Sequence, residues 1–348
     1  MKFGVFYFAD GGDVTRPGVY DLLLAGARFA DENGFTAVWT PERHFHTFGG
    51  IYPNPSVVSA ALVGITSRVQ IRAGSVVAPL HDPLRIVEDW SVIDNLSHGR
   101  VGLSFASGWN AGDFVLAPGS YRERYEVLAD TVSTVRSLWR GGTVTRTDGN
   151  GDTREVRVFP QPVQPELPVW ITSAGSTATF EYAGSVGAGV LTHLLGQDTE
   201  ELAGKIAAYR KARAASGATG PGNVTLMLHT FLGTDRDQVR AIVRGPMLDY
   251  LRSSFNLVSK ADLDALPDDE DTAAMIDELV EAAFERYFSE GGLFGTVEDG
   301  VATVARLRDL GVDEIGCLID FGPADSLVLD SLQHLRQLKD RCDAQFGD

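Results

Sequence analysis

Apolar and polar residues alternate in short runs that predict strands, and longer runs between them have the spacing of amphipathic helices. The strand patterns cover residues 2–8, 35–40, 69–77, 101–106, 167–172, 188–193, 224–232 and 314–320. The helical patterns include residues 18–33, 56–66, 83–96, 176–186, 199–216, 297–310 and 326–342. Eight strands that alternate with helices predict an α/β protein with one closed (β/α)8 TIM barrel, spanning residues 1–348 as a single domain.

Two segments depart from this alternation. Residues 141–162 alternate Val and Thr around Asp148-Gly149-Asn150-Gly151, which predicts a surface hairpin. Residues 245–295 have helix-like ends around an acidic, Pro-containing middle, and lie between the seventh strand and the helix before the eighth. In a barrel this helical insertion is placed over the catalytic face, so a substrate lid is one interpretation. A dimer contact or a solvent-facing excursion is the other.

Polar side chains follow the second strand, where the apolar run of residues 35–40 ends in Glu42, Arg43 and His44. A satisfied Arg–Glu pair beside surface histidines would explain this stretch alone. However, chemistry in a barrel collects at the carboxyl ends of the strands, and polar residues recur there. The other strand ends carry Ser75 and His81, then Ser107, Gly108, Trp109 and Asn110, then Ser173 to Thr177, His193, His229 and Asp320. This recurrence favours an active site.

The loop after the fifth strand is a candidate phosphate site. It consists of Ser173, Ala174, Gly175, Ser176 and Thr177, and it opens a helix whose first amide groups and dipole favour an anion. A plain helix N-cap is the alternative interpretation. No GxGxxG motif is present, so a permanently bound nicotinamide dinucleotide is not indicated.

A metal hydrolase is a competing interpretation of the same strand ends. His44 and His46 would form a His-x-His pair, completed by His193 or His229 and by Asp320. The adjacent Arg43 opposes it, because a fixed cation disfavours a divalent ion. The sequence therefore favours a phosphate-bearing cofactor over a metal.

The composition limits the classes of partner that the chain is expected to bind. With 30 Lys and Arg against 47 Asp and Glu, the net charge is −17, which argues against nucleic acids and anionic membranes as partners. No transmembrane pattern or signal peptide is visible. Cys317 and Cys342 are the only cysteines and lie in apolar patterns, so a reducing, cytoplasmic location is expected.

Several motifs together resemble the bacterial luciferase-like flavin monooxygenases. They are WTPERHFHTFGG, RAGSVVAPLHDPLRIVEDWSVIDNLSHGRVGLSFASGWNAGDF, GAGVLTHLLGQ, AFERYFSEGGLFGT and DEIGCLIDFG. The chain is most similar to a subgroup associated with nonribosomal-peptide and polyketide natural-product biosynthesis. The resemblance implies a barrel, usually dimeric, that binds FMN at its carboxyl face. It also implies a separate reductase that supplies reduced flavin, and dioxygen as co-substrate. We therefore expect a two-component monooxygenase that hydroxylates or oxidises a small or carrier-tethered intermediate. We also expect a homodimer.

The resemblance also assigns site residues. His44, Arg43 and Glu42 are expected to be catalytic. The cofactor is expected to contact Gly74, Ser75, Ser107, Gly108, Trp109, Asn110, Ser173, Ala174, Gly175, Ser176 and Thr177. Family members carry a non-prolyl cis peptide on the third strand, so a cis bond or a bulge is predicted between Gly74 and Ser75.

The chain departs from the family prototype at two positions. Arg43 stands where the prototype has a catalytic histidine, and the proton chemistry is therefore assigned to His44, because arginine stays protonated and imidazole titrates near neutral pH. Ser107 replaces an arginine near the flavin phosphate, so Arg122 or Arg124 is expected to meet that charge. A deazaflavin-dependent dehydrogenase or reductase, or a flavin-binding protein without turnover, remains an alternative.

Overall fold

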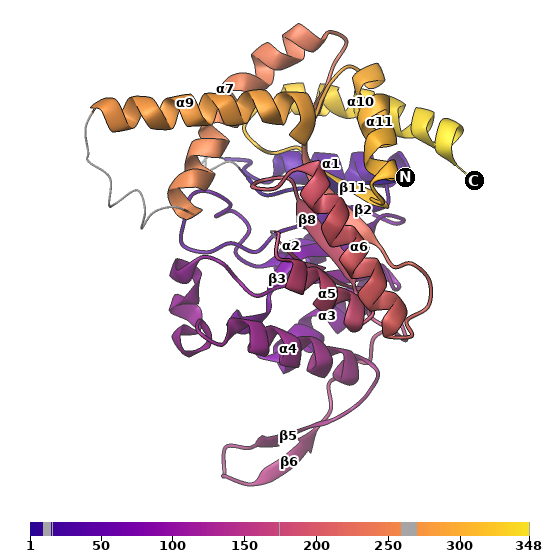
Figure 1. Ribbon diagram of the computed structural model, residues 1–348. Coiled ribbons are helices and arrows are strands. Elements are labelled where there is room, and N and C mark those ends of the chain that lie inside the picture. Colours follow the sequence, from indigo (N-terminus) through magenta and orange to yellow (C-terminus); the bar gives the residue numbers. More distant parts are fainter. Residues whose placement is uncertain (10–14, 16, 174, 259–269, 348) are drawn as a thin grey trace.

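The chain forms a closed barrel of parallel strands, as predicted. The computed structural model describes residues 1–9, 15, 17–173, 175–258 and 270–347 (Figure 1). The barrel strands are β1 (Lys2–Phe6), β2 (Ala37–Thr40), β3 (Gln70–Val77), β4 (Val101–Ala106), β7 (Val169–Thr172), β8 (Gly189–His193), β9 (Val224–Leu232) and β11 (Glu314–Leu318). Each pairs with the next in parallel, and β11 closes the barrel on β1. The predicted (β/α)8 fold is confirmed.

Helices alternate with these strands. They are α1 (Asp21–Glu32), α2 (Pro55–Val63), α3 (Pro83–Ser97), α4 (Arg124–Trp139), α5 (Thr177–Ser185), α6 (Thr199–Ala215), α10 (Val297–Asp309) and α11 (Asp325–Phe346). The short 3-10 helices η1 (Ala78–Leu80), η2 (Ala111–Leu116) and η3 (Pro118–Ser120) follow β3 and β4. Within the described residues, none of the helices is both long and apolar enough to cross a membrane.

Helix starts follow local chemistry. The Asn54 side chain accepts hydrogen bonds from the first amides of α2, where Pro55 occupies the first turn. Asp82 does the same for α3. Thr296 and Asp299 form a reciprocal capping box at the start of α10. These caps satisfy amides that would otherwise lack partners, and they fix where each crossover turns back toward the barrel.

Two barrel strands end before their hydrophobic runs do. β1 ends at Phe6 rather than at residue 8, because the amides of Phe8 and Ala9 donate to the Asp320 carboxylate at 2.7 and 2.9 Å instead of to a neighbouring strand. β11 likewise ends at Leu318 rather than at residue 320. The carboxyl ends of β1 and β11 are therefore joined through a side chain.

The two irregular segments lie outside the barrel. Within residues 141–162, β5 (Val144–Thr147) and β6 (Thr153–Val156) pair antiparallel, and Figure 1 shows them extending away from the barrel. The second segment contains α7 (Arg236–Val258), α9 (Glu270–Arg286), the π-helix η4 (Tyr287–Gly291) and β10 (Leu293–Gly295). α7 begins before residue 245, the predicted start of the insertion, and residues 259–269 lie outside the described residues.

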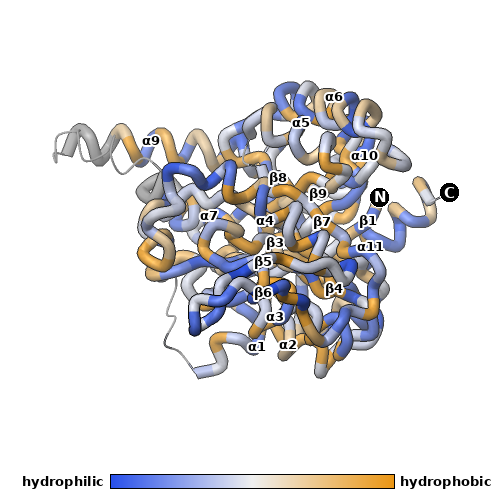
Figure 2. Tube along the Cα trace, turned by 90° about the horizontal axis from the view of Figure 1, so that it is seen from below, coloured by the Kyte–Doolittle hydropathy of each residue, from blue (hydrophilic) through white to orange (hydrophobic). Residues whose placement is uncertain are grey.

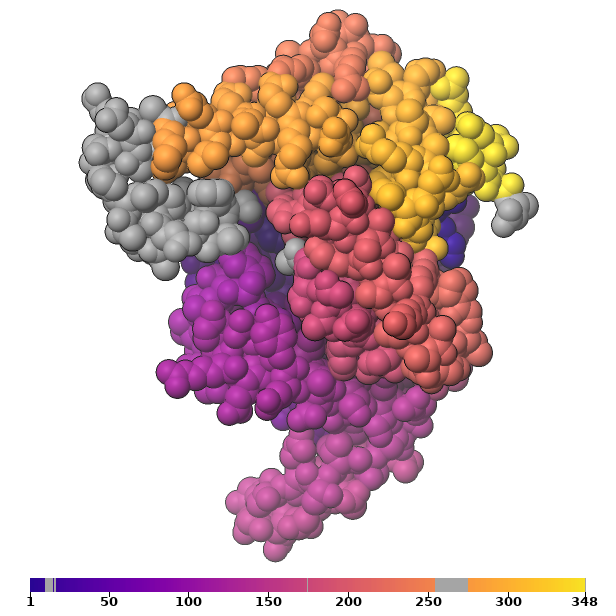
Figure 3. Space-filling view, in the orientation of Figure 1, coloured from indigo at the N-terminus to yellow at the C-terminus, as the bar shows by residue number. Residues whose placement is uncertain are grey.

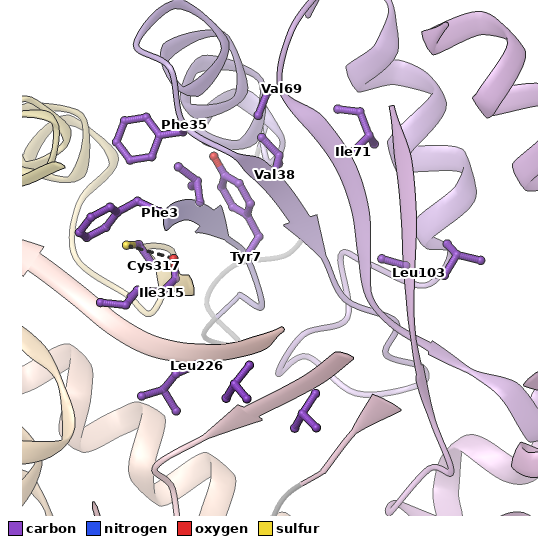
Figure 4. Packing of buried hydrophobic residues seen from close by; sticks show 14 of the residues in the cluster. Phe3, Tyr7, Phe35, Val38, Val69, Ile71, Leu103, Leu226, Ile315 and Cys317 are labelled. Carbon is purple, nitrogen blue, oxygen red and sulfur yellow. Dashed lines mark hydrogen bonds between the residues drawn. The ribbon is translucent and has the colours of Figure 1, made fainter. Parts of the chain in front are cut away.

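Strand periodicity divides the core into two layers. Successive side chains of a strand point to opposite faces, so alternate residues face the helices or the barrel interior. Phe3, Val38, Ile71, Leu103 and Leu226 belong to the layer under the helices (Figure 4). The interior layer instead contains side chains such as Phe6, Trp39 and Trp170, together with residues of α7, α9 and η4. Figure 2 shows the hydrophobic stretches concentrated along the central strands.

A buried polar cluster fills the interior near the start of the strands. The Arg72 guanidinium lies over the rings of Trp39 and Trp170, at 4.8 and 4.4 Å from their centroids. Its Nη1 donates to both carboxylate oxygens of Glu314 at 2.9 and 3.0 Å. Trp39 Nε1 donates to the same carboxylate at 3.2 Å. The charges are thus paired within the barrel, as burial requires.

Glycines on neighbouring strands make room for the large rings. A Cβ atom on Gly189 would lie 2.5 Å from Cδ1 of Trp170, and one on Gly102 would lie 2.9 Å from Cζ3 of the same ring. Trp170 cannot move freely, because its Nε1 donates to Asn223 Oδ1 at 2.8 Å. Small residues beside large ones are therefore a steric requirement of this interior.

This requirement predicts that replacing glycine by alanine changes the free energy of unfolding in opposite directions at two positions. Gly189→Ala should lower the free energy of unfolding by about 1–3 kcal/mol, because the added methyl group overlaps Trp170. Gly204→Ala on α6 is the matched control: among the described residues, nothing lies within 4 Å of its added Cβ. It should raise stability by about 0.5–1 kcal/mol through helix propensity. Urea unfolding of both variants measures the difference, and equal effects would contradict the steric account.

Candidate active site

Glu42 is the centre of a buried cluster after β2. His44 Nε2 and His81 Nε2 lie 2.8 and 2.6 Å from its Oε1, and the Val77 amide donates to its Oε2 at 2.8 Å. Glu42 and His44 are buried, whereas the side chain of His81 is 30% exposed. One carboxylate thus joins the ends of β2 and β3 and the turn before α3.

These contacts shift the titration of two members. Burial alone would raise the pKa of Glu42, but the hydrogen bonds from His44, His81 and Val77, with the charge on His81, lower it below its usual value. Burial alone would lower the pKa of His81, yet its hydrogen bond to Glu42 and the charges of Glu42 and Asp89 raise it. Each group therefore favours the charged form of the other.

Arg43 points to a different partner. It is 2% exposed, and its Nη1 forms an ion pair with Asp113 in η2. Its guanidinium lies over the Trp109 ring, 4.9 Å from the centroid. Asn110 Nδ2 donates to Asp113 Oδ1 at 2.9 Å. The Arg–Glu pair that would explain this stretch alone is therefore not formed, because Asp113 meets the charge of Arg43.

The end of β3 is irregular where the sequence predicts it to be. The peptide between Gly74 and Ser75 is cis, and the register with β4 shifts between Gly74 and Val76. This confirms the predicted cis bond. A Cβ on Gly74 would lie 2.8 Å from the Phe6 ring, so only glycine fits there. Ser75 Oγ contacts Thr172 Oγ1 on β7, which also contacts Ser104 Oγ on β4 at 2.6 Å.

Two further predicted groups lie at neighbouring strand ends. Ser107 and Gly108 follow β4, and Gly108 has φ +78° with the Phe114 ring 2.8 Å from where its Cβ would lie. Trp109 is 49% exposed. In Figure 3 the surface is hollowed between the magenta part of the chain, which includes β4, and the crimson part, which includes α5 and α6.

The loop from β7 to α5 offers anion-binding groups. The Gly175 amide donates to Ser173 Oγ at 3.3 Å, and the Ser176 side chain does not cap α5, which begins at Thr177. Lys205 Nζ would lie 3.5 Å from a Cβ on Gly175, which places a cation beside this loop. Ala174, the remaining predicted residue of the loop, lies outside the described residues. The start of α5 with an ammonium group beside it is a candidate phosphate site. Lys205 Nζ also donates to Gln197 Oε1 at 2.9 Å and lies 3.7 Å from Glu201 Oε2.

Other predicted residues do not join these groups. His46 is exposed, and its Nδ1 accepts from the Phe48 amide at 3.0 Å. Arg122 is exposed, whereas Arg124 lies over the rings of Tyr121 and Tyr125. Across the described ranges, no three His, Cys, Asp or Glu side chains are arranged as a metal site. The His-x-His arrangement of the metal-hydrolase interpretation is thus not found there.

Sequence reasoning missed Asp113 and Lys205. Asp113 lies 70 residues after Arg43, and no local pattern links the two. Lys205 lies on α6, one crossover away from the loop that it adjoins, and the expectation named Arg122 or Arg124 in its place. In both cases the signal is tertiary, because only closure of the barrel brings the partners together.

Comparison with known proteins identifies the family. The profile of the luciferase-like monooxygenases matches residues 1–314. The chain belongs to this family. The flavin-dependent trigonelline monooxygenase oxygenase component of Acinetobacter baylyi is 25% identical over 340 residues, covering 92% of this chain and 90% of that protein. The alkanal monooxygenase alpha chain of Photorhabdus luminescens is 25% identical over 69% of this chain and 66% of that protein. The prediction of a luciferase-like flavin-dependent oxidoreductase is confirmed.

Solved structures share the fold. Monooxygenase RslO1 from Streptomyces bottropensis superposes with a TM-score of 0.81 at 24% identity, covering 97% of this chain and 98% of that one. The oxygenating constituent of 3,6-diketocamphane monooxygenase from Pseudomonas putida, solved with FMN, gives 0.74 at 14% identity, over 96% and 97% of the chains. An F420-dependent secondary alcohol dehydrogenase gives 0.72 at 17% identity, over 97% of each chain. These similarities establish the fold and leave the flavin type open.

The paired titration of Glu42 and His81 predicts a pH window for stability. A carboxylate whose pKa is lowered on folding stabilises the folded state at pH values above its unfolded pKa, about 4.3. A histidine whose pKa is raised on folding stabilises the folded state fully at pH values below its unfolded pKa, about 6.5. The loss of thermal stability in His81→Gln should therefore be largest between about pH 4.3 and 6.5. It should shrink as pH falls through the pKa of Glu42 or rises through that of His81.

Thermal unfolding across pH measures this loss. His334→Gln on α11 provides a histidine control away from the cluster. A destabilisation by His81→Gln that is independent of pH would show that the pair does not act through charge.

Proposed function

We propose that the chain is the oxygenase component of a two-component, FMN-dependent monooxygenase. It would receive reduced FMN from a separate reductase and use dioxygen to hydroxylate or oxidise a small or carrier-tethered natural-product intermediate. The observation that carries the proposal is the buried Glu42–His44–His81 cluster beside the cis Gly74–Ser75 bond, at the carboxyl end of a luciferase-like barrel. The oxygenase component that resembles this chain supports the two-component arrangement.

FMN fits the groups at the strand ends. The phosphate would be held by Ser173, Gly175, Ser176 and Thr177, with Lys205 supplying the positive charge. Lys205 replaces the arginines expected from the sequence. The ring system would rest near the following residues of β3 and β4: Gly74, Ser75, Ser107, Gly108, Trp109 and Asn110. When bound, reduced FMN supplies the electrons that activate dioxygen.

Residues of the chain would control proton transfer in the proposed reaction. The bond between His44 Nε2 and Glu42 fixes the imidazole orientation and leaves Nδ1 to exchange a proton with the reacting group. Arg43 keeps its charge and orients an anionic or polar group, because a guanidinium does not release its proton in a protein. Burial of both side chains excludes water, which would otherwise favour release of dioxygen as hydrogen peroxide when it oxidises the reduced flavin.

The face that carries α2 favours a homodimer. α2 has the mostly apolar sequence PSVVSAALV, and its Val57 is 66% exposed. On the adjacent α3, Val92 and Leu96 are 45% and 58% exposed. Apolar helix faces left in water mark contacts with another surface, and a second copy of the chain is the occupant that we propose.

A deazaflavin-dependent dehydrogenase is the second candidate, because a protein with that cofactor shares the barrel. Anaerobic titration of the purified chain with reduced FMN and with a reduced deazaflavin distinguishes the two. We expect reduced FMN to bind, and admission of oxygen to give a transient absorbance that differs from those of reduced and oxidised FMN. Tight binding of the deazaflavin alone, with no reaction with oxygen, would refute the monooxygenase proposal.

His44→Ala should uncouple flavin oxidation from product formation. Affinity for reduced FMN should change less than about twofold, because the phosphate site lies on other strands, while hydrogen peroxide replaces most of the oxidised product. His46→Ala is the matched control, since His46 is exposed and lies only two positions away. Peroxide and product are measured together in single turnover. If His44→Ala stays coupled while Arg43→Ala does not, the two roles are reversed.

A further inference from the structure

Two neighbouring strands end in polar side chains that face the barrel interior and reach solvent. Trp170 on β7 and Leu191 on β8 belong to the interior layer and are buried. Thr172 and His193 lie two positions further along these strands, so they face the interior as well. Both are half-buried, and the hollow in Figure 3 adjoins α5 and α6, which follow β7 and β8. The interior is therefore open to solvent at the level of Thr172 and His193.

One nitrogen of His193 is used by the chain itself. Its Nδ1 accepts a hydrogen bond from the Leu195 amide at 3.1 Å. Burial lowers the pKa of His193 to about 4, so the imidazole is neutral near neutral pH. A neutral imidazole carries one N–H group, and because Nδ1 accepts, the hydrogen is on Nε2. His193 is thus an uncharged hydrogen-bond donor with a fixed tautomer.

The Nε2 donor of His193 is available to a ligand. Within the part of the chain that the structure describes, Nε2 has no hydrogen-bond partner, and it is not one of the unpaired polar atoms that are closed off from solvent. The backbone beside the ring is held in place, because Gln197 Nε2 donates to the His193 carbonyl oxygen at 2.5 Å. The donor is therefore positioned by the chain but not used by it.

The neighbours of His193 favour a flavin as the ligand. Gln197 Oε1 accepts from Lys205 Nζ at 2.9 Å. A Cβ on Gly175 would lie 3.5 Å from Lys205 Nζ and 3.9 Å from Gln197 Oε1. His193 is thus linked through Gln197 to the loop that is proposed to hold the FMN phosphate. The ribityl chain follows the phosphate in FMN, so it would be the part of the flavin nearest to the ends of β7 and β8.

We propose that His193 donates its Nε2–H to an uncharged oxygen of the ribityl chain of bound FMN. The inference rests on the proposed function and adds a binding residue to it. The phosphate is a less suitable acceptor, because a neutral imidazole brings no positive charge and Lys205 is already placed to supply one. A ribityl hydroxyl needs no opposite charge when it is largely removed from water.

Two substitutions separate this donor from the bond to Leu195. In His193→Asn, the side-chain oxygen can still accept from the amide two positions further on, as asparagine commonly does, but the Nε2 donor is lost. In His193→Gln, the longer side chain places an amide N–H near the position of Nε2, and the bond to Leu195 is lost.

Reduced FMN should bind about five- to tenfold more weakly to His193→Asn than to the wild type, and within about twofold of the wild type to His193→Gln. Anaerobic calorimetry measures these dissociation constants. Thermal unfolding of the flavin-free proteins should give the reverse order, with His193→Gln the less stable variant. His334→Asn on α11 is the control and should leave FMN affinity unchanged.

Reduced riboflavin distinguishes the ribityl chain from the phosphate as the acceptor. It carries the same ribityl chain and ring but no phosphate, so it should bind more weakly overall. The ratio of dissociation constants between His193→Asn and the wild type should nevertheless be the same as for reduced FMN. A ratio that disappears with riboflavin would assign the donor to the phosphate and overturn the proposal.

Two further results would also overturn it. Equal affinity of the wild type and His193→Asn for reduced FMN would show that Nε2 does not contact the flavin. A loss in His193→Gln as large as that in His193→Asn would show that only the bond to Leu195 matters. Either result, with a wild type that binds reduced FMN, leaves the monooxygenase proposal intact. A wild type that binds no reduced FMN would overturn both proposals, so the two failures are distinguishable.

Discussion

The geometry of the barrel at the carboxyl ends of its strands, here called the mouth, depends on the pairing of one buried carboxylate. Glu42 cannot remain charged without water unless donors surround it, and the donors come from three places: His44 on its own loop, the Val77 amide at the end of β3, and His81 beyond η1. Satisfying the charge therefore fixes these segments relative to one another. The position of His44, and hence the proposed proton chemistry, is a consequence of that requirement.

A second carboxylate has a similar effect at the ends of β1 and β11. Asp320 accepts from the amides of Phe8 and Ala9 and from the Tyr52 hydroxyl, the last at 3.1 Å. It thereby links the ends of β1 and β11 to the loop after β2. The loop that carries Glu42, Arg43 and His44 is thus held from both sides, which gives a long irregular segment the fixed geometry that catalysis needs.

The sequence predicted the parts of the structure that depend on local pattern. The ranges of β4 and β9 agree with their hydrophobic runs, and the ends of β1 and β11 differ because Asp320, distant in sequence, captures two amides. The cis bond after Gly74 was predictable through the resemblance alone. The pairing of Arg43 with Asp113 and the placement of Lys205 were not, because each depends on contacts between separate crossovers.

The Arg72 cluster determines how molecules reach the reaction site. With Arg72 held between Trp39 and Trp170 and paired with Glu314, the barrel interior is packed with side chains near the start of the strands. In the proposed reaction, flavin, oxygen, substrate and product would all enter and leave at the carboxyl end of the barrel. A product that dissociates slowly would therefore block binding of the next reduced flavin in the proposed reaction. Product release would then contribute to the rate of the proposed reaction.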